Sequence, residues 1–281
     1  MKIDIFTQLR KYYFEIILIA ILLFMYQQSF SVWFSAWTSV DSFYSFALFI
    51  FGFLGYLYKT HYDKLKEIPK EPSFFGSPFL LAGFICYTAG IRAGIEYLTN
   101  LSLPLFIGGI ILALYGKKVF KITLIPLILF ACTLPILPLF RITMPLQFLS
   151  TKLTVMFLNT LGVSAYNEGT IVCIEHYKLS VVAGCSGFKS LTTLFFMCIM
   201  YSYFIKTTLF KKVLFSFISL PLAIIMNTLR ISAVGIYTVY GYKDVQSFHD
   251  NLGIVAFVIS LGIIIGLMKT LEDKEDENQN E

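Results

Sequence analysis

Long apolar runs separated by short polar segments dominate the chain and predict its helices. About eight of these runs are long enough to cross a bilayer, whose apolar core of about 30 Å takes roughly twenty helical residues. The predicted spans cover residues 12–30, 42–58, 74–97, 101–115, 122–140, 186–205, 213–240 and 252–268. The pattern therefore predicts an all-α polytopic membrane protein.

One long segment, residues 141–184, interrupts this pattern. Met144 to Gly162 is amphipathic, and we expect a short helix in the interface plane or a re-entrant piece there. Its polar face carries Gln147, Ser150, Thr151 and Thr154. Gly169 to Val182 alternates polar and apolar positions, which predicts a short extracytoplasmic hairpin. The chain thus divides into N-terminal helices (1–140), a membrane core (141–269) and an acidic tail (270–281).

Composition narrows the class of protein. The chain is 57% hydrophobic and only 14% charged, so it lacks the charged surface of a soluble domain of 281 residues. The net charge of +5 is not a nucleic-acid signature, because the basic residues lie in short loops between apolar runs. The first apolar run, about Phe14 to Met25, continues without a cleavage site and is interpreted as a retained anchor.

The basic residues also predict an orientation. With the N-terminus in the cytoplasm, most Lys and Arg residues fall in inward-facing segments, whereas the outward segments at 27–40 and around Asn100 carry none. The positive-inside rule then places both termini in the cytoplasm of a multi-pass plasma-membrane protein. The segments at 141–184 and around 247–253 face the extracytoplasmic side.

The motif Ala183-Gly184-Cys185-Ser186-Gly187 joins the hairpin to the next apolar run. Its glycines permit a tight turn at the thiol. A helix that begins near Ser186 has Cys185 at its N-terminus, where the helix dipole favours a thiolate. A single Cys on an apolar helix is more often a packing residue, so this motif alone is weak evidence. The five cysteines show neither a disulfide framework nor a metal-ligand spacing, and no cofactor is expected.

Two further polar residues stand at the edges of apolar runs. Arg230 follows Asn227 in the run 220–239, and counting from Val213 puts it about 26 Å along the helix, near the outer surface. His249 precedes the last span on the same side. Taken singly, Arg230 fits a snorkelling anchor, His249 a cap residue and Asn227 a partner for a carbonyl. Together, a Cys, an Arg and a His at one depth fit acyl-transfer chemistry better.

Three stretches carry a family resemblance: VVAGCSGFKSL, NTLRIS and FHDNLG. They resemble the exosortase/archaeosortase family of integral membrane cysteine transpeptidases, over roughly Leu134 to Leu267. The resemblance implies Cys185 as nucleophile, Arg230 as the stabilising arginine and His249 as the acid/base partner. A His at the third position looks more like exosortases than archaeosortases. Gly184, Ser186, Gly187 and Asn227 are expected to support the site or bind substrate.

The resemblance also implies partners. The expected substrates are exported proteins that end in a short motif, a transmembrane helix and a basic cluster, and the expected acceptor is a membrane lipid or a lipid-linked group. Nucleic acid is not expected as a partner.

Other interpretations remain open at this point. One alternative is a disulfide between Cys173 and Cys185, and His176 is a reserve candidate for the base. A transporter or channel, or a non-catalytic membrane subunit of a polysaccharide or secretion assembly, is the alternative function.

Overall fold

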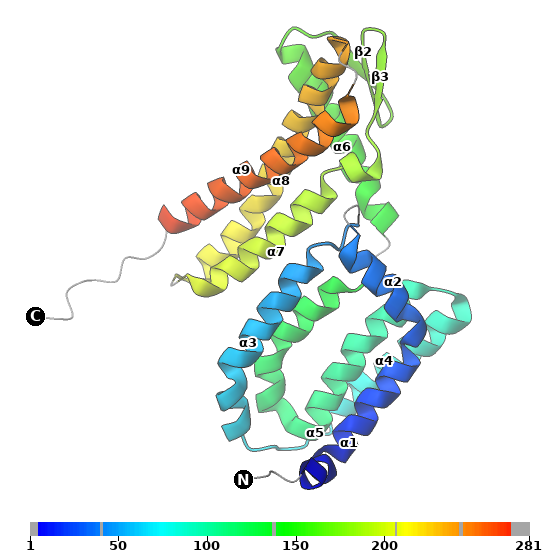
Figure 1. Ribbon diagram of the computed structural model, residues 1–281, viewed down its shortest axis with the longest axis vertical. Coiled ribbons are helices and arrows are strands. Elements are labelled where there is room, and N and C mark those ends of the chain that lie inside the picture. Colours follow the sequence, from blue (N-terminus) through cyan, green and yellow to red (C-terminus); the bar gives the residue numbers. More distant parts are fainter. Residues whose placement is uncertain (1–4, 40–41, 137–138, 206, 242–243, 271–281) are drawn as a thin grey trace, which may run out of the picture. The chain divides into compact units, whose positions relative to one another are not determined.

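The protein consists mainly of helices, with one small sheet (Figure 1). The structure is a computed structural model that describes residues 5–39, 42–136, 139–205, 207–241 and 244–270. It divides into an N-terminal and a C-terminal compact unit, with the boundary between positions 137 and 138. The predicted acidic tail lies almost wholly outside the described residues.

The described residues of the N-terminal unit form five helices. They are α1 (Ile5–Met25), α2 (Gln27–Thr38), α3 (Ala47–Glu67), α4 (Gly76–Ala93) and α5 (Glu96–Thr133).

The segment at 27–40 was expected to be a connection between two spans, but residues 27–38 form the helix α2, which follows α1 after a bend of 76°. Tyr26 and Trp33 are each 1% exposed and pack with Leu103 of α5. Trp33 Nε1 donates to Asn100 Oδ1 at 2.9 Å. Burial of these aromatic side chains holds the segment as a helix.

The helix α5 reverses direction in its middle. At about 1.5 Å per residue its 38 residues would extend about 57 Å if straight, well beyond a bilayer core of about 30 Å. Gly116 interrupts it with φ of 84°, a value that favours glycine, and a Cβ there would lie 2.0 Å from the carbonyl oxygen of Glu71. Gly108 of the first arm faces Leu127 of the second. Residues 96–115 and 117–133 therefore form two packed arms, which correspond to the predicted fourth and fifth runs.

The C-terminal unit surrounds a central helix. Its elements are α6 (Leu139–Thr160), β1 (Ala165–Glu168), β2 (Ile171–Ile174), β3 (Tyr177–Ser180), a 3-10 turn (Ala183–Cys185), α7 (Phe188–Phe204), α8 (Leu209–Val239) and α9 (Val245–Thr270). The helices α7 and α9 lie against α8 (Figure 1). Leu194, Phe215 and Ile264 belong to the apolar core that these helices share.

The polar face of α6 points inward. Ser150, Thr151 and Thr154 are at most 2% exposed, and Ser150 contacts Asn227 of α8. The helix expected at Met144 to Gly162 is present as α6, of 22 residues, but its polar face is buried against α8; a position in the interface plane or a re-entrant path remains a prediction. Its hydroxyl groups are short enough to be buried against a neighbouring helix. Ser150 Oγ donates to the carbonyl of Ser186 and Thr151 Oγ1 to the carbonyl of Gln147, whereas Thr154 Oγ1 has no hydrogen-bond partner among the described residues.

The small sheet directly precedes the 3-10 turn in the chain. The predicted hairpin is present as β2 and β3, and β1, which was not predicted, pairs with β2 to make an antiparallel sheet of order β1-β2-β3. Val172 and Ile174 are buried against Ile231 of α8. Because the sheet is anchored on α8, the turn that follows it has a fixed position above that helix.

Several helices have the length and composition of membrane spans. Among the described residues α5, α8 and α9 meet this criterion, and the bent pair α1–α2 adds a fourth candidate. These helices are consistent with the predicted helical membrane protein, and eight spans remain a prediction.

Candidate active site

Cys185 lies on a 3-10 turn in front of α7. Its backbone N–H donates to the carbonyl of Val182 at 2.8 Å. The helix begins at Phe188, after Gly187 in a left-handed conformation with φ of 79°. The helix predicted to begin near Ser186 is therefore present and begins two residues later, so Cys185 lies on the preceding 3-10 turn and not in the first turn of α7.

A buried network of polar side chains holds the turn. The amide of Asn227 donates to the carbonyl of Cys185 at 2.9 Å and to Ser150 Oγ at 3.2 Å. Ser150 Oγ in turn donates to the carbonyl of Ser186 at 3.2 Å. Ser186 Oγ donates back to the carbonyl of Ala183 at 2.6 Å. The backbone on both sides of the thiol is thereby tied to α6 and α8.

The two glycines of the motif differ in what they do. A Cβ at Gly187 would lie 2.9 Å from Cγ of Asn227, so this glycine permits both the left-handed backbone and the close approach of α8. A Cβ at Gly184 would meet nothing within 4 Å. Gly187 is structurally required, whereas Gly184 borders open space beside the thiol.

His249 lies next to the thiol. Its Nε2 is 3.3 Å from Cys185 Sγ, within hydrogen-bonding distance for sulfur. The two residues are 64 positions apart and come from the 3-10 turn and the first turn of α9. The His249 side chain is 19% exposed, so the pair is sheltered but still open to the surface. A thiol and an imidazole in this arrangement can exchange a proton.

Two charged groups lie near Nδ1 of the imidazole, the ring nitrogen that does not contact the thiol. Arg230 Nη2 lies 3.2 Å from His249 Nδ1, and Arg230 Nε donates to the carbonyl of His249 at 3.2 Å. The carboxylate of Asp250 lies 3.0 Å from the same Nδ1 and is itself held by the amide of Gln246 at 3.1 Å. A guanidinium only donates and a carboxylate only accepts, so the protonation of Nδ1 decides which of the two is its partner.

That choice fixes the chemistry of the ring. With a proton on Nδ1, His249 donates to Asp250, and the lone pair on Nε2 faces the thiol, as a general base requires. With no proton on Nδ1, Arg230 donates to it, and Nε2–H points at sulfur. The first form can accept the proton of Cys185; the doubly protonated ring also keeps its bond to Asp250.

Burial raises the pKa of the Cys185 thiol above its ordinary value, and Asp250 raises it further. Arg230 and a backbone hydrogen bond from Val182 act in the opposite direction but do not outweigh burial. The expectation of a thiolate stabilised by a helix dipole is therefore wrong for this resting state. The thiol needs a base, and His249 is the base within reach.

Gly253 makes room for the guanidinium. A Cβ at this position would lie 2.9 Å from Arg230 Nη2, one turn after His249 on α9. Sequence reasoning missed the contributions of Gly253, Asp250 and Ser150. Spacing contained a signal for the first two, since the FHDNLG stretch has an acid next to His249 and a glycine four positions after it.

The alternative partners are not part of this cluster. His176 is exposed in the turn between β2 and β3 and makes no hydrogen bond to another described residue. Cys173 is buried in β2, and both Cys173 and Cys185 are free thiols. The geometry therefore brings together Cys185, Arg230 and His249, with Asn227, Ser186 and Gly187 in support.

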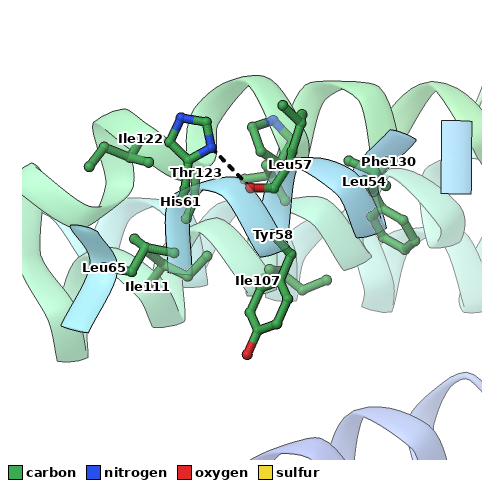
Figure 2. Close-up of a pocket in the computed structure, with 12 residues that line it drawn as sticks. Leu54, Leu57, Tyr58, His61, Leu65, Ile107, Ile111, Ile122, Thr123 and Phe130 are labelled. Carbon is green, nitrogen blue, oxygen red and sulfur yellow. Dashed lines mark hydrogen bonds between the residues drawn. The ribbon is translucent and has the colours of Figure 1, made fainter. Parts of the chain in front are cut away.

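An apolar hollow in the N-terminal unit has a different character. It has a volume of about 340 Å³ and lies between α3 and the two arms of α5. Figure 2 shows its lining, in which the His61 ring is bonded to the carbonyl of Leu57 at 3.0 Å. Aliphatic and aromatic side chains make up most of the wall, and it contains no pair of reactive groups. It is not a candidate active site.

These features define a helical membrane protein with a cysteine–histidine–arginine centre at one end of its C-terminal unit. A protein-family model described as transmembrane exosortase matches residues 33–266. The chain therefore belongs to the transmembrane exosortase family, which is in general a family of cysteine transpeptidases. No curated protein and no solved structure gives a significant match.

Proposed function

We propose that this protein is a membrane-embedded cysteine transpeptidase or protease that cleaves the C-terminal sorting signals of exported proteins. The observation that carries the proposal is the 3.3 Å contact between Cys185 Sγ and His249 Nε2, with Arg230 on the opposite side of the ring. Family membership supports it independently, since the match spans both units.

The first half-reaction uses the thiol and the imidazole. His249 Nε2 takes the proton from Cys185, and the thiolate attacks the scissile carbonyl carbon to give a tetrahedral oxyanion. Arg230 stabilises this negative charge; its Nη1 has no hydrogen-bond partner among the described residues and remains available. When the C–N bond breaks, His249 gives its proton to the leaving amine, and a thioester on Cys185 remains.

The second half-reaction releases the product. An acceptor amine, or water, loses a proton to His249 and attacks the thioester carbonyl. The C–S bond breaks, and the proton returns to the Cys185 thiolate. An amine gives a new amide, as expected for transfer to a membrane-linked acceptor, and water gives a free carboxylate. Asp250 keeps a hydrogen bond to Nδ1–H through both halves.

The expected substrate enters through the membrane. A substrate anchored by its own transmembrane helix presents its cleavage motif at a fixed depth, which makes attack by Cys185 effectively intramolecular. We further propose that the site faces the extracytoplasmic side of the plasma membrane.

A processing assay tests the proposal. A reporter with a C-terminal motif, a transmembrane helix and a basic cluster is co-expressed with the full chain, and its gel mobility is followed. Processing is expected with the wild type and is expected to stop with Cys185→Ala. Cys198→Ala is the matched control, since Cys198 is a buried cysteine on α7 of the same unit. Normal processing with Cys185→Ala excludes the cysteine mechanism.

A further inference from the structure

The N-terminal unit contains a second, partly polar hollow of about 300 Å³, separate from the apolar one. It lies where the first turns of α2, the end of α4 and the start of α5 meet. Its wall includes Gln28, Ser29, Trp33, Glu96 and Thr99. This end of the first α5 arm is opposite the turn at Gly116, where the Lys118–Glu71 ion pair lies.

Most polar side chains of this hollow have no partner within the chain. Among the described residues, the side chains of Gln28, Ser29, Glu96 and Thr99 make no hydrogen bond or ion pair. Asn100, which also lines the hollow, is occupied by Trp33 and by the carbonyl of Pro135, both at 2.9 Å. Unpaired polar groups that converge on one cavity are expected to bind a ligand or water.

The chemistry of the wall favours a cation. Glu96 is the sole charged residue among the described residues of the wall, and none of these is Lys, Arg or His. The Glu96 carboxylate, the Gln28 amide oxygen and the Thr99 hydroxyl can each accept a hydrogen bond, and a primary ammonium group has three N–H bonds to donate. A ligand whose only charge is a phosphate or a carboxylate finds no counter-charge among the described residues of this wall.

The wall of the hollow also contains exposed apolar side chains. Val32 and Ile91 belong to it and are 45% and 58% exposed. Trp33 and Tyr26 pack beside it, and such aromatic rings are typical of the zone between the lipid headgroups and the acyl chains. A wall that combines unpaired polar side chains with exposed apolar ones, at the end of candidate membrane helices, matches a lipid headgroup that has its acyl chains alongside.

We propose that this hollow is a binding site for the primary ammonium headgroup of a membrane lipid, with Glu96 as its counter-charge. The site does not depend on the proposed peptidase activity, because it lies in the N-terminal unit and is defined by its own residues.

Lipid binding to the purified full chain in detergent tests this proposal. Trp33 lines the hollow, and the centroid of the Trp37 ring lies 6.3 Å from that of Trp33. These are the two tryptophans of the chain, so tryptophan emission reports on this region. Phosphatidylethanolamine, phosphatidylcholine and phosphatidylglycerol with identical acyl chains are titrated in turn. Phosphatidylethanolamine is expected to bind at least about fivefold more tightly than the other two, because hydrogen bonds to charged groups are the stronger ones.

Two variants separate the ammonium site from general lipid adsorption. Glu96→Gln keeps the shape and removes the charge, and it is expected to abolish the preference for phosphatidylethanolamine. Glu71→Gln removes a carboxylate at the other end of the unit and is expected to keep it. Equal binding of all three lipids, or an unchanged preference in Glu96→Gln, overturns the proposal. Competition by soluble ethanolamine at the same concentration as the lipid overturns the assignment to a lipid.

Discussion

The thiol of Cys185 lies between two charges of opposite sign. The Arg230 guanidinium favours the thiolate, whereas the Asp250 carboxylate opposes it, and both also face His249 Nδ1. The pKa of the thiol and the tautomer of the ring are therefore controlled by the same two residues. Changes at Arg230 and Asp250 are expected to move these properties in different directions.

The first prediction concerns Arg230→Gln. Because Arg230 lowers the pKa of Cys185, its loss raises that pKa further, and the thiolate forms only at higher pH. The rate of Cys185 alkylation, measured by mass spectrometry of its peptide across a pH series, is expected to reach its midpoint at higher pH than in the wild type. Lys178→Gln, whose ammonium pairs with Glu168 on the sheet, is the control and is expected to leave the midpoint in place. A midpoint that falls or stays constant in Arg230→Gln contradicts the electrostatic role.

The second prediction concerns Asp250→Asn. Loss of this negative charge lowers the pKa of Cys185, so alkylation is expected to shift to lower pH. Processing of the reporter is nevertheless expected to fall by about 10²-fold or more, since the ring loses the partner that holds the proton on Nδ1. If Asp250 had only a structural role, its loss would not lower the pH of the alkylation midpoint while it also lowered the rate of processing.

Asp244→Asn is the control for that separation. Asp244 caps the backbone of Ser247 at the start of α9 at 3.3 Å and has no contact with the ring. It is expected to keep both the alkylation profile and the processing rate near wild type. If Asp250→Asn processes the reporter as well as Asp244→Asn does, Asp250 does not position His249.

The sequence predicted which reactive residues lie together, because this depends on the depth of each residue in the membrane. The predicted topology puts Cys185, Arg230 and His249 at those ends of their apolar runs that share one side of the membrane, and this alone suggests that they meet. The ionisation of the thiol was not predictable, because it depends on burial that only the packed structure determines. Ser150 escaped notice for a similar reason: nothing in its own helix indicates that it bonds to Ser186 and Asn227.

At the scale of elements, the third prediction compares the two glycines of the motif. Gly187→Ala places a Cβ 2.9 Å from Asn227 in a left-handed backbone, and this strain is expected to cost about 1–3 kcal/mol. Gly184→Ala meets open space and is expected to change stability little. The melting temperatures of the two variants in detergent measure the difference. Equal melting temperatures contradict the tight packing of the turn on α8.

The elements themselves were predictable to different degrees. Apolar periodicity predicted the positions of α8 and α9 well, because long helices have strong patterns. It missed α2 and β1, whose formation depends on aromatic and aliphatic side chains buried by distant helices. It also misjudged the polar face of α6, since polarity alone does not distinguish a face in water from one bonded to α8.

At the scale of the whole molecule, the geometry of the C-terminal unit restricts its orientation. Cys185 and the first turn of α9 share one site and therefore lie on the same side of any membrane that α9 crosses. Within the N-terminal unit, the turn at Gly116 separates the two arms of α5, and Lys117 and Lys118 follow it directly. The positive-inside rule predicts that this lysine-rich turn is cytoplasmic and that the Cys185 site is not.

The fourth prediction tests that orientation with introduced cysteines. In a background without native cysteines, Gln246→Cys and Lys118→Cys are exposed to a membrane-impermeant thiol reagent added to intact cells. Both residues are exposed in the structure, so each is expected to react when the reagent reaches its side. Gln246→Cys is expected to label in intact cells, and Lys118→Cys only after the membrane is permeabilised. Labelling of Lys118→Cys alone in intact cells reverses the predicted orientation. It would place the thiol, the imidazole and the guanidinium in the cytoplasm, where they could not act on the exported part of a substrate.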